Sequence, residues 1–349
     1  MAATWPRRPR WRRAPAPAPA METVIYLDID GVLNVGIGDN GGTAPLLLND
    51  NNCNMALGVK DLSIVKPQER DYIEKLVAVS KQDIGNKEPG TYMDYVCRGK
   101  EHCSHVLLDR LATIIRAAGD KPRVVLASNW RKPKYRRKVR TLEKAIAARI
   151  GSEFEFDDTT EVVSESGAAD RLRCIGGHLR EFCVHAKPSD IVRALVLDDF
   201  FVTPLQGWTC DGSKIRGQAD VEAYLMHCVE RPGLEIKLVH CYDEWQVNDS
   251  LRVEVGTGLT LRRMREAAVF LQAAPRRSSD DVQSNTTVGG LFRSSAGGDS
   301  WAQAASPASK KARMSNRFSS ILSLALPSRP RSRATVAPCS VPADMFECG

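Results

Sequence analysis

Five short apolar runs, each the length of a β-strand, alternate along the chain with stretches of helical periodicity. The first run, residues 23–27, is rich in β-branched side chains and predicts a strand buried on both faces. Further strands are predicted at 123–128, 154–156, 193–199 and 235–241. Helices are predicted over 71–82, 105–118, 176–185, 221–229 and 260–271, together with a basic helix that ends near 150. This alternation predicts an α/β fold with a mainly parallel sheet of about five strands and right-handed crossovers.

The segment between the first strand and the helix at 105–118 follows a different pattern. Residues 35–60 are rich in Gly, Asn and Asp and are predicted to be loops, and residues 84–100 are again rich in turn-forming residues. The segment holds about 70 residues, more than a connection between two elements needs. We therefore expect residues 35–103 to form an insertion after the first strand.

Both ends of the chain differ from the middle in composition. Residues 1–20 are rich in Arg, Pro and Ala, and residues 276–349 in Ser, Arg, Ala and Pro, so both are predicted to be disordered. Residues 21–275 are then the folded domain. Of the net charge of +7, residues 1–20 carry +5 and residues 275–349 another +5, which leaves −3 for the rest. The basic balance belongs to the ends and is weak evidence that the domain binds nucleic acid.

The amino-acid composition says more about the cellular compartment of the protein than about its function. Hydrophobic and charged contents of 43% and 26% are ordinary for a globular protein, and no apolar run approaches the roughly 18 residues of a membrane span. The ten cysteines are scattered along the chain, which favours reduced thiols in an intracellular compartment. The sequence leaves the oligomeric state open. The cytoplasm is favoured. The acid-free, Arg-rich start is compatible with an organelle transit peptide, and Lys310–Arg313 with nuclear import.

Two carboxylates directly follow the first predicted strand. Asp28 and Asp30 are two positions apart, so alternation along an extended chain would point both to roughly the same side. Gly31 then permits an immediate turn. A buried strand has no structural need for two acids at its end, so this pair indicates a site.

Two other predicted strands also end in polar residues. The strand at 193–199 ends in Asp198 and Asp199, and the strand at 123–128 ends in Ser128. Because the carboxyl ends of parallel strands meet at one edge of a sheet, we expect these side chains to lie near the first pair. Four neighbouring carboxylates would repel one another unless a cation intervened, and Mg²⁺ prefers such oxygen ligands. The sequence therefore predicts a magnesium site.

The motif Asp28-x-Asp30-Gly31 resembles motif I of the haloacid dehalogenase (HAD) superfamily. Ser128 and the pair Asp198–Asp199 follow in the order of motifs II and IV. The resemblance implies a HAD-like, Rossmannoid three-layer sandwich in which an insertion after the first strand forms a flap or small cap. It also implies an enzyme, a Mg²⁺-dependent phosphatase (phosphoric monoester hydrolase) acting through an aspartyl-phosphate intermediate.

The same resemblance implies a role for each of these residues. Asp28 would be the nucleophile, and Asp30 the general acid and base. Asp28, the backbone carbonyl of Asp30, and Asp198 would hold Mg²⁺, with Asp199 as a direct ligand or an outer partner. The residues expected to bind substrate are Ser128, Asn129, Trp130 and Arg131.

HAD enzymes also place a Lys or Arg, motif III, near the phosphoryl oxygens, usually at the start of the helix before the fourth strand. Arg173 stands just before the helix predicted at 176–185 and is the first candidate. Lys187, which follows that helix, and Arg171 are the alternatives. Each has the competing interpretation of a solvated surface charge.

A closer resemblance is to the HAD domain of Swiss Army Knife RNA repair-like proteins, and it covers about residues 22–273. It rests on Leu-Asp-Ile-Asp-Gly-Val-Leu-Asn at 27–34, Ser-Asn-Trp-Arg at 128–131, an Arg at motif III and Gly-Leu-Thr at 258–260. It implies a nucleotide or nucleic-acid phosphate as the phosphorylated substrate. Seven basic residues within 131–140 would suit that substrate, although a solvated helix face explains them equally well.

Two other interpretations stay open. The first is a catalytically inactive HAD-like module whose tails and insertion recruit partners. The second is a phosphotransferase or haloacid-type hydrolase that uses the same nucleophile. Asp30 argues against the inactive module and the dehalogenase, because neither needs an acid for a leaving oxygen. Cys97, His102, Cys103 and His105 lack the paired spacing of a zinc site and are interpreted as ordinary residues of the insertion.

Overall fold

The computed structural model describes residues 20–274, except for 39–45, 62, 64–66, 86–87, 164–166, 201–206 and 249–250. The described residues all belong to one compact unit. The two extensions predicted to be disordered, and the basic patch at 310–313, lie outside the described residues apart from Ala20. All eight cysteines in the described part are free thiols. No helix in that part is both long and apolar enough to cross a bilayer.

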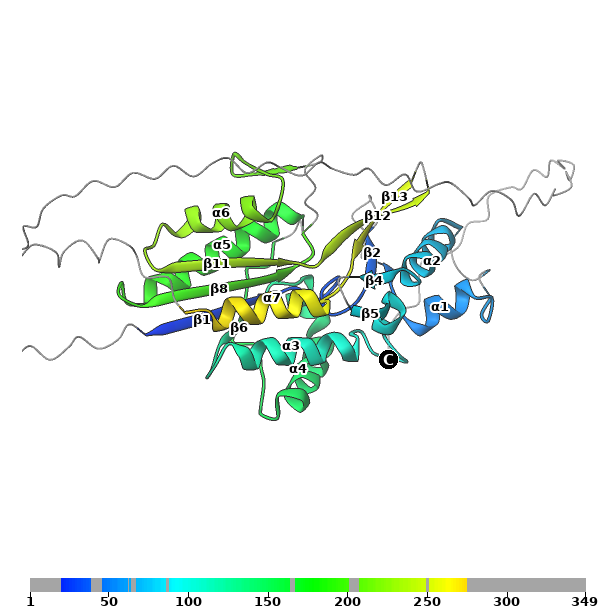
Figure 1. Ribbon diagram of the computed structural model, residues 1–349, viewed down its shortest axis with the longest axis horizontal. Coiled ribbons are helices and arrows are strands. Elements are labelled where there is room, and N and C mark those ends of the chain that lie inside the picture. Colours follow the sequence, from blue (N-terminus) through cyan, green and yellow to red (C-terminus); the bar gives the residue numbers. More distant parts are fainter. Residues whose placement is uncertain are drawn as a thin grey trace, which may run out of the picture. The chain divides into compact units, whose positions relative to one another are not determined.

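Five parallel strands form the central sheet (Figure 1). They are β1 (Met21–Leu27), β6 (Arg123–Leu126), β7 (Asp158–Thr159), β8 (Ile191–Asp198) and β11 (Leu234–His240). Their order across the sheet is β11-β8-β1-β6-β7. The predicted α/β fold is therefore confirmed, and this sheet is parallel throughout. The first strand lies between the two other strands that end in candidate site residues.

Helices cover both faces of this sheet (Figure 1). On one face lie α3 (His105–Ala117), α4 (Arg136–Ile150) and α7 (Leu261–Gln272). On the other lie α5 (Ala168–His185) and α6 (Gln218–Val229). Two short 3₁₀-helices, η3 (Asn129–Arg131) and η4 (Pro133–Tyr135), link β6 to α4. A small hairpin, β9 (Trp208–Cys210) and β10 (Ser213–Ile215), precedes α6.

Strand alternation decides which face each side chain meets. In β1, Ile25 and Leu27 pack among the residues of α3, α4 and α7, whereas Val24 and Tyr26 pack among those of α5 and α6. The same parity holds in β8, where Val196 faces α5 and α6. Even-numbered positions at the ends of both strands are therefore directed toward the face that α5 covers.

The insertion has more regular structure than its sequence predicts. It contains β2 (Gly36–Gly38), β3 (Leu46–Leu47), α1 (Asp50–Ala56), α2 (Pro67–Ser80), β4 (Asp83–Gly85), β5 (Glu88–Thr91) and the 3₁₀-helix η2 (Tyr92–Tyr95). The prediction that residues 35–60 form loops was therefore wrong. The reason is long-range pairing: β2 pairs with residues 254–256 of a late strand, so its backbone groups are satisfied from far along the chain.

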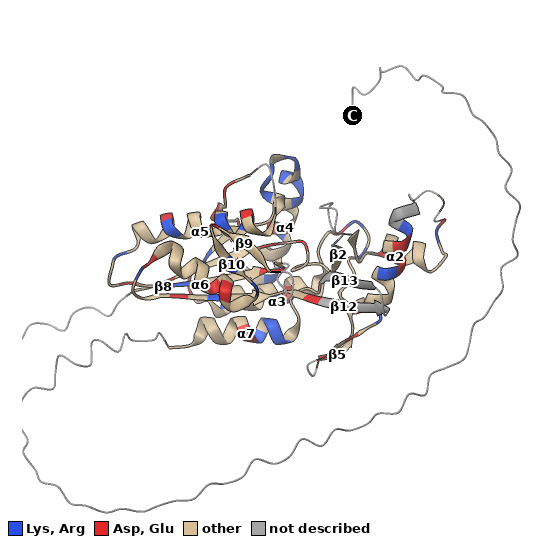
Figure 2. Cartoon of the chain, turned by 90° about the horizontal axis from the view of Figure 1, so that it is seen from above, with Lys and Arg blue, Asp and Glu red and all other residues tan. Residues whose placement is uncertain are grey.

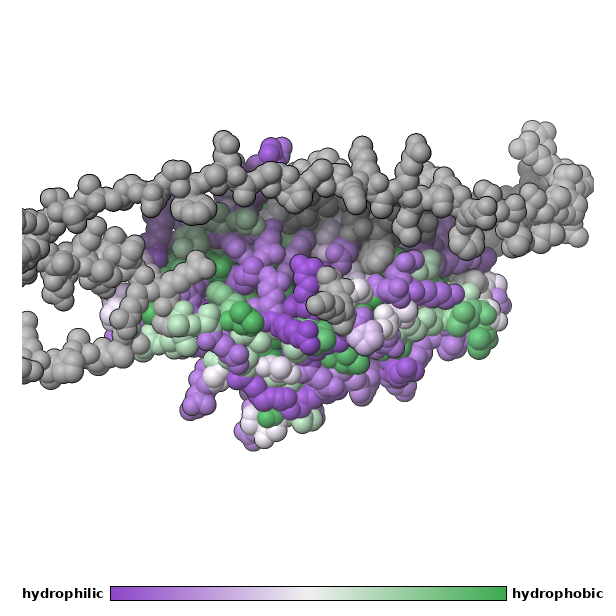
Figure 3. Space-filling view, in the orientation of Figure 1, coloured by the Kyte–Doolittle hydropathy of each residue, from purple (hydrophilic) through white to green (hydrophobic). Residues whose placement is uncertain are grey.

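A second sheet joins the insertion to the end of the domain. The sequence did not predict the hairpin of β12 (Tyr242–Asn248) and β13 (Leu251–Gly256). This hairpin pairs with β2 and β3 in the antiparallel order β12-β13-β2-β3. Buried residues of the insertion, such as Leu76 and Tyr95, share one apolar cluster with Leu107 and Leu111 of α3. The insertion thus extends the main core. In Figure 3, hydrophobic residues on the visible face of the described part form small, separate groups among hydrophilic ones.

Two predicted boundaries were wrong. The strand predicted at 154–156 is instead β7 at 158–159. The rings of Phe154 and Phe156 pack edge to face on each other and lie against the core. The helix predicted to begin at Gly176 begins eight residues earlier, at Ala168. Gly176 lies inside that helix, at a point where α6 comes close. A Cβ at this position would lie 2.9 Å from Cys228 Sγ on α6. The glycine marks a close helix–helix contact instead of a helix start.

Glu88 of β5 connects the insertion to two helices of the sheet. Its side chain is 6% exposed, and Oε1 accepts hydrogen bonds from Tyr95 and from Arg110 of α3. Oε2 accepts a 2.7 Å hydrogen bond from the backbone N–H of Leu261, the first residue of α7. That N–H has no partner within its own helix. One buried carboxylate therefore holds the insertion hairpin, α3 and the start of α7 together.

We expect Glu88→Ala to lower the free energy of unfolding by about 3 kcal/mol, because breaking a buried ion pair leaves Arg110 without its carboxylate. The matched control is Glu101→Ala, since the pair that Glu101 forms with His105 is exposed and should contribute little. Urea denaturation followed by tryptophan fluorescence measures both variants. Equal losses would contradict the role given to Glu88.

Candidate active site

Three carboxylates converge at the carboxyl edge of the parallel sheet. Asp28 follows β1, and its backbone N–H donates to the carbonyl of Leu197 in the neighbouring β8, at 2.9 Å. Asp198 is the last residue of β8, and Asp199 is the next. One carboxylate oxygen from each of the three lies within 4.8 Å of the others. Asp28 and Asp198 occupy even positions of adjacent strands, so their side chains leave the sheet on the side of α5.

Arg171, in the first turn of α5, is the cation at the centre of this group. Its Nη1 forms an ion pair with Asp28, and its Nη2 lies 2.9 Å from Asp198 and 3.3 Å from Asp199. The guanidinium also stacks over the ring of Phe200, 4.9 Å from the ring centroid. Arg171 therefore contacts all three carboxylates that the strand ends bring together.

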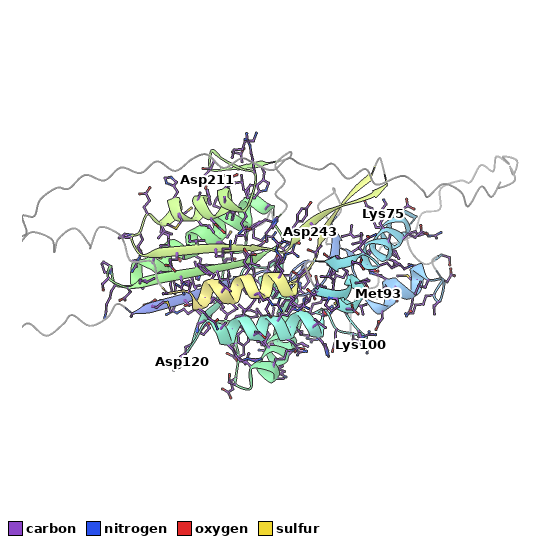
Figure 4. All side chains as sticks on the ribbon, viewed as in Figure 1. Lys75, Met93, Lys100, Asp120, Asp211 and Asp243 are labelled. Carbon is purple, nitrogen blue, oxygen red and sulfur yellow. The ribbon has the colours of Figure 1, made fainter. Side chains whose placement is uncertain are left out.

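Arg173, the first candidate for the basic motif, is not part of this group. Its side chain is 51% exposed and pairs with Asp170 and with Asp211. Figure 4 labels Asp211, which lies on the β9–β10 hairpin beyond α6. The error follows from the misplaced helix start: both arginines lie inside α5, and two helical positions differ by about 200°, so only one can face the sheet.

Lys187, the other alternative, follows the far end of α5 and is exposed. Since α5 spans eighteen residues, its two ends are separated by about 27 Å at 1.5 Å per residue. Of the three basic candidates, the structure therefore selects Arg171.

Asp30 has different neighbours from Asp28, although only Ile29 separates them. Its Oδ2 accepts a 3.0 Å hydrogen bond from the indole N–H of Trp130, and its Oδ1 accepts one of 3.1 Å from Asn34. The expectation that Asp30 points to the same side as Asp28 by strand alternation does not apply. β1 ends at Leu27, and a turn closed by hydrogen bonds to the carbonyl of Ile29 follows.

The residues after β6 are held mainly by the protein itself. Ser128 is fully buried and caps η3, where its Oγ accepts from the backbone N–H of Trp130 at 3.4 Å. A hydroxyl also carries a donor, so this bond leaves Ser128 able to donate. Arg131 donates to the carbonyls of Ala127, Ser128 and Glu161. Trp130 is 4% exposed. Arg131 and Trp130, which were predicted to bind substrate, thus brace the loop and Asp30.

Burial and mutual repulsion raise the pKa values of the carboxyl groups at this edge. Burial raises the pKa of Asp199 to about 7; Arg171 opposes that shift, and the charges of Asp28 and Asp30 add to it. Burial likewise raises the pKa of Asp198. Burial and the charge of Asp28 raise the pKa of Asp30, and the hydrogen bonds from Asn34 and Trp130 oppose the rise. The pKa of Arg171 is also above its ordinary value, because the three carboxylates outweigh the effect of its burial.

The donor set fits a small hard cation. One guanidinium faces three carboxylates, which leaves excess negative charge in a buried place. Both carboxylate oxygens of Asp198 are buried and meet no hydrogen-bond geometry, even though Arg171 is near. Oxygen ligands in this number and of this type suit Mg²⁺. Asp28, Asp198 and Asp199 would hold it.

Unsatisfied polar atoms gather at the same edge. Buried side-chain atoms without a hydrogen-bond partner occur in Asn129, Thr160, Arg171 and Asp198. Thr160 directly follows β7, Asp198 ends β8, Asn129 begins η3 in the loop after β6, and Arg171 lies in the first turn of α5. Since buried polar atoms are nearly always paired, such a gathering indicates a place where a ligand supplies the partners.

Lys and Arg gather on α4, as Figure 2 shows. Of the seven basic residues in 131–140, Lys134, Arg136, Arg137 and Arg140 are exposed. Lys138 instead lies over the rings of Trp130 and Tyr135, which stack at 6.4 Å. Because Trp130 contacts Asp30, this basic surface begins beside the carboxylates.

The Cys/His residues of the insertion do not form a metal-binding group. Cys97 and Cys103 are buried, and His105 pairs with Glu101 at the surface. Within the described residues, the acidic trio at the sheet edge is the cluster with ligand atoms close enough to share a metal ion.

Comparison with models of known protein families, with curated proteins and with solved structures finds no match to this chain. The geometry of the site is therefore the basis for assigning its chemistry. Sequence reasoning named the four acids and Ser128, and it ranked Arg171 third among the basic residues. It included Asn34 only as the last residue of the motif at 27–34 and gave it no role in the site.

Two glycines allow the backbone to approach Asp199. Gly31 has φ +82°, and a Cβ there would lie 2.0 Å from Asp199 Oδ2. Gly256, the last residue of β13, would place a Cβ 2.3 Å from the Cα of Gly31. There is therefore no room for a methyl group where the turn after Asp30 meets the second sheet and the carboxylate of Asp199.

We expect Gly31→Ala to lower the free energy of unfolding by more than the roughly 1–2 kcal/mol of a left-handed backbone, because its methyl group would also displace Asp199. Gly119→Ala is the matched control: its φ is +85°, and a Cβ there meets nothing within 4 Å. Gly119 precedes Asp120, at the opposite end of α3 from Lys100 (Figure 4). Urea denaturation of both variants gives the difference. Losses of equal size would show that no clash exists at Gly31.

Proposed function

We propose that this protein is a HAD-like, Mg²⁺-dependent phosphatase that hydrolyses phosphomonoesters through an aspartyl-phosphate formed on Asp28. The observation that carries the proposal is the contrast between two acids in one short motif. Asp28 pairs with Arg171 among the buried carboxylates, whereas Asp30 is held by the neutral donors Trp130 and Asn34. The first arrangement suits a nucleophile, and the second suits a group that gains and loses a proton.

Asp28 is prepared for attack by fixed contacts. Its Oδ1 accepts a 2.7 Å hydrogen bond from the backbone N–H of Ile29, and its Oδ2 pairs with Arg171. These contacts fix the orientation of the carboxylate, as attack on phosphorus requires. One oxygen of Asp28 forms a bond to phosphorus while the bond from phosphorus to the leaving oxygen breaks.

Asp30 supplies and recovers the proton. In the first step its carboxyl group donates a proton to the leaving oxygen, so the alcohol departs neutral. In the second step the Asp30 carboxylate takes a proton from water as that water attacks phosphorus. The bond between phosphorus and Asp28 breaks, inorganic phosphate leaves, and both acids return to their starting states.

Arg171 and Ser128 would bind the phosphoryl group. Arg171 reaches Asp28 from the first turn of α5, and its Nε has no hydrogen-bond partner. A guanidinium and a hydroxyl donor next to the nucleophile neutralise and orient phosphoryl oxygens. When bound by Asp28, Asp198 and Asp199, Mg²⁺ supplies the further positive charge that phosphoryl transfer requires.

The favoured substrate is a phosphate on a nucleotide or on a nucleic-acid end. The support for it is the basic surface of α4 that begins beside Trp130, together with the motif resemblance to RNA repair-like proteins. The rival, a non-catalytic binding module, would have no use for a second acid held by two dedicated hydrogen-bond donors.

Phosphate release from a panel of phosphomonoesters, including 5′- and 3′-phosphorylated oligonucleotides, tests the proposal on the full chain. We expect turnover that requires Mg²⁺ and that is abolished in both Asp28→Asn and Asp30→Asn. Each substitution removes one carboxylate charge with little change in shape, so folding is a minor concern. Circular dichroism checks that both variants retain the fold.

Two results would decide against this proposal. Turnover that survives Asp28→Asn would exclude Asp28 as the nucleophile. A folded wild-type protein that gains thermal stability with Mg²⁺ and releases no phosphate from any substrate would favour the binding module.

The choice of Arg171 over Arg173 gives a second test. We expect Arg171→Lys to lower kcat by about 100-fold, because an ammonium cannot contact several carboxylate and phosphoryl oxygens in one plane. Arg173→Lys makes the same chemical change on the exposed side of the same helix and should change kcat less than about 3-fold. Steady-state kinetics on one phosphomonoester compare the two. A larger loss for the Arg173 variant would contradict the assignment.

A further inference from the structure

Asp30 is held by two donors that are themselves fixed by one surface residue. Trp130 Nε1 donates to Oδ2 at 3.0 Å, and Asn34 Nδ2 donates to Oδ1 at 3.1 Å. Both donors are buried and neutral. Each carboxylate oxygen has two lone pairs, so every oxygen of Asp30 keeps one acceptor position after these bonds form. The carboxylate is oriented but still able to accept or donate a proton.

His102, near the end of the insertion, contacts both donors and holds them in place. Its carbonyl accepts a 3.0 Å hydrogen bond from Asn34 Nδ2, and its ring packs edge to face on Trp130 at 5.8 Å. Asn34 is further fixed because its Oδ1 accepts from the backbone N–H of Gly31 at 2.8 Å. The ring of Tyr135 also stacks on the indole, at 6.4 Å. The indole therefore has little freedom to turn away from Asp30.

The chemistry of an indole restricts what it can do here. An indole N–H donates and cannot accept, so it cannot take the proton of Asp30. It also carries no charge, unlike the guanidinium of Arg171 that pairs with Asp28. A buried indole also offers little surface to a substrate. Its remaining role is to fix the direction of the Asp30 carboxylate.

We propose that Trp130 is the positioning residue of the acid/base Asp30, with Asn34 as the second donor and His102 as the common support. This inference rests on the proposed phosphatase function and adds to it. The indole N–H fixes Oδ2 so that the carboxyl group faces the leaving oxygen. The insertion thus takes part in proton transfer through His102, without contacting the reacting atoms.

The expected signature depends on the leaving group. A nitrophenolate leaves readily without a proton, whereas an alkoxide must be protonated as it departs. If Trp130 positions the acid, Trp130→Phe should lower kcat/KM, which reports the first step, for an alkyl phosphate by about 100-fold and for nitrophenyl phosphate by less than about 3-fold. The hydrolysis of the aspartyl-phosphate, for which Asp30 is the base, is common to both substrates and enters kcat only.

Two further variants separate the N–H from the ring. Replacement of Trp130 by benzothienylalanine keeps the shape of the indole and removes only the N–H, so it should reproduce the kcat/KM pattern of Trp130→Phe with normal stability. Trp208→Phe makes the same chemical change at a tryptophan of β9 and should leave the ratio of the two kcat/KM values unchanged. Equal losses of kcat/KM on both substrates would overturn the positioning role.

A measurement without turnover tells this inference apart from the proposed function. The indole ¹H–¹⁵N resonance of Trp130 is identified by its loss in Trp130→Phe, and Asp30→Ala should shift it and speed its hydrogen exchange. An unaffected resonance would overturn the contact and the inference, whatever the activity. A shifted resonance in a wild-type protein that hydrolyses neither substrate would overturn the phosphatase proposal, and the role of Trp130 in proton transfer with it.

Discussion

The central constraint on this structure is the concentration of buried negative charge at the carboxyl edge of the sheet. Asp28, Asp198 and Asp199 lie within 4.8 Å of one another, in surroundings where repulsion is poorly screened. Arg171 offsets part of that charge through contacts with all three. One guanidinium cannot neutralise three carboxylates, so the site is built to receive more positive charge. This imbalance is the basis of the proposal that a cation binds there.

The same constraint explains why two acids two residues apart have different surroundings. Asp28 continues the parity of β1 and therefore faces α5, from which Arg171 reaches it. Asp30 stands in a turn and faces the loop after β6, where its partners are an indole and an amide. Pairs of carboxyl groups whose environments differ in this way can divide the roles of nucleophile and acid. A short motif thereby provides two chemically distinct groups.

Long-range pairing gives this arrangement its rigidity. β2, at the start of the insertion, pairs with β13, which ends at Gly256, and Gly256 packs against Gly31 beside Asp199. Glu88 fastens the other side of the insertion to α3 and α7. Residues 34 and 102, at the two ends of the insertion, meet beside Asp30. The insertion is therefore part of the frame that fixes the turn after β1.

The sequence by itself determined the parallel sheet, most of its helices and the acids at the strand ends, because hydrophobic periodicity and strand-end chemistry are local signals. It did not decide among Arg171, Arg173 and Lys187, because that choice depends on where α5 begins. The prediction placed the start of this helix at Gly176, eight residues too late. Only the tertiary structure decided that β2 pairs with β13 and that Trp130 and Asn34 hold Asp30. Those contacts join segments far apart along the chain. Their partners are selected by packing and by the pairing of buried polar groups, and neither leaves a periodic trace in the sequence.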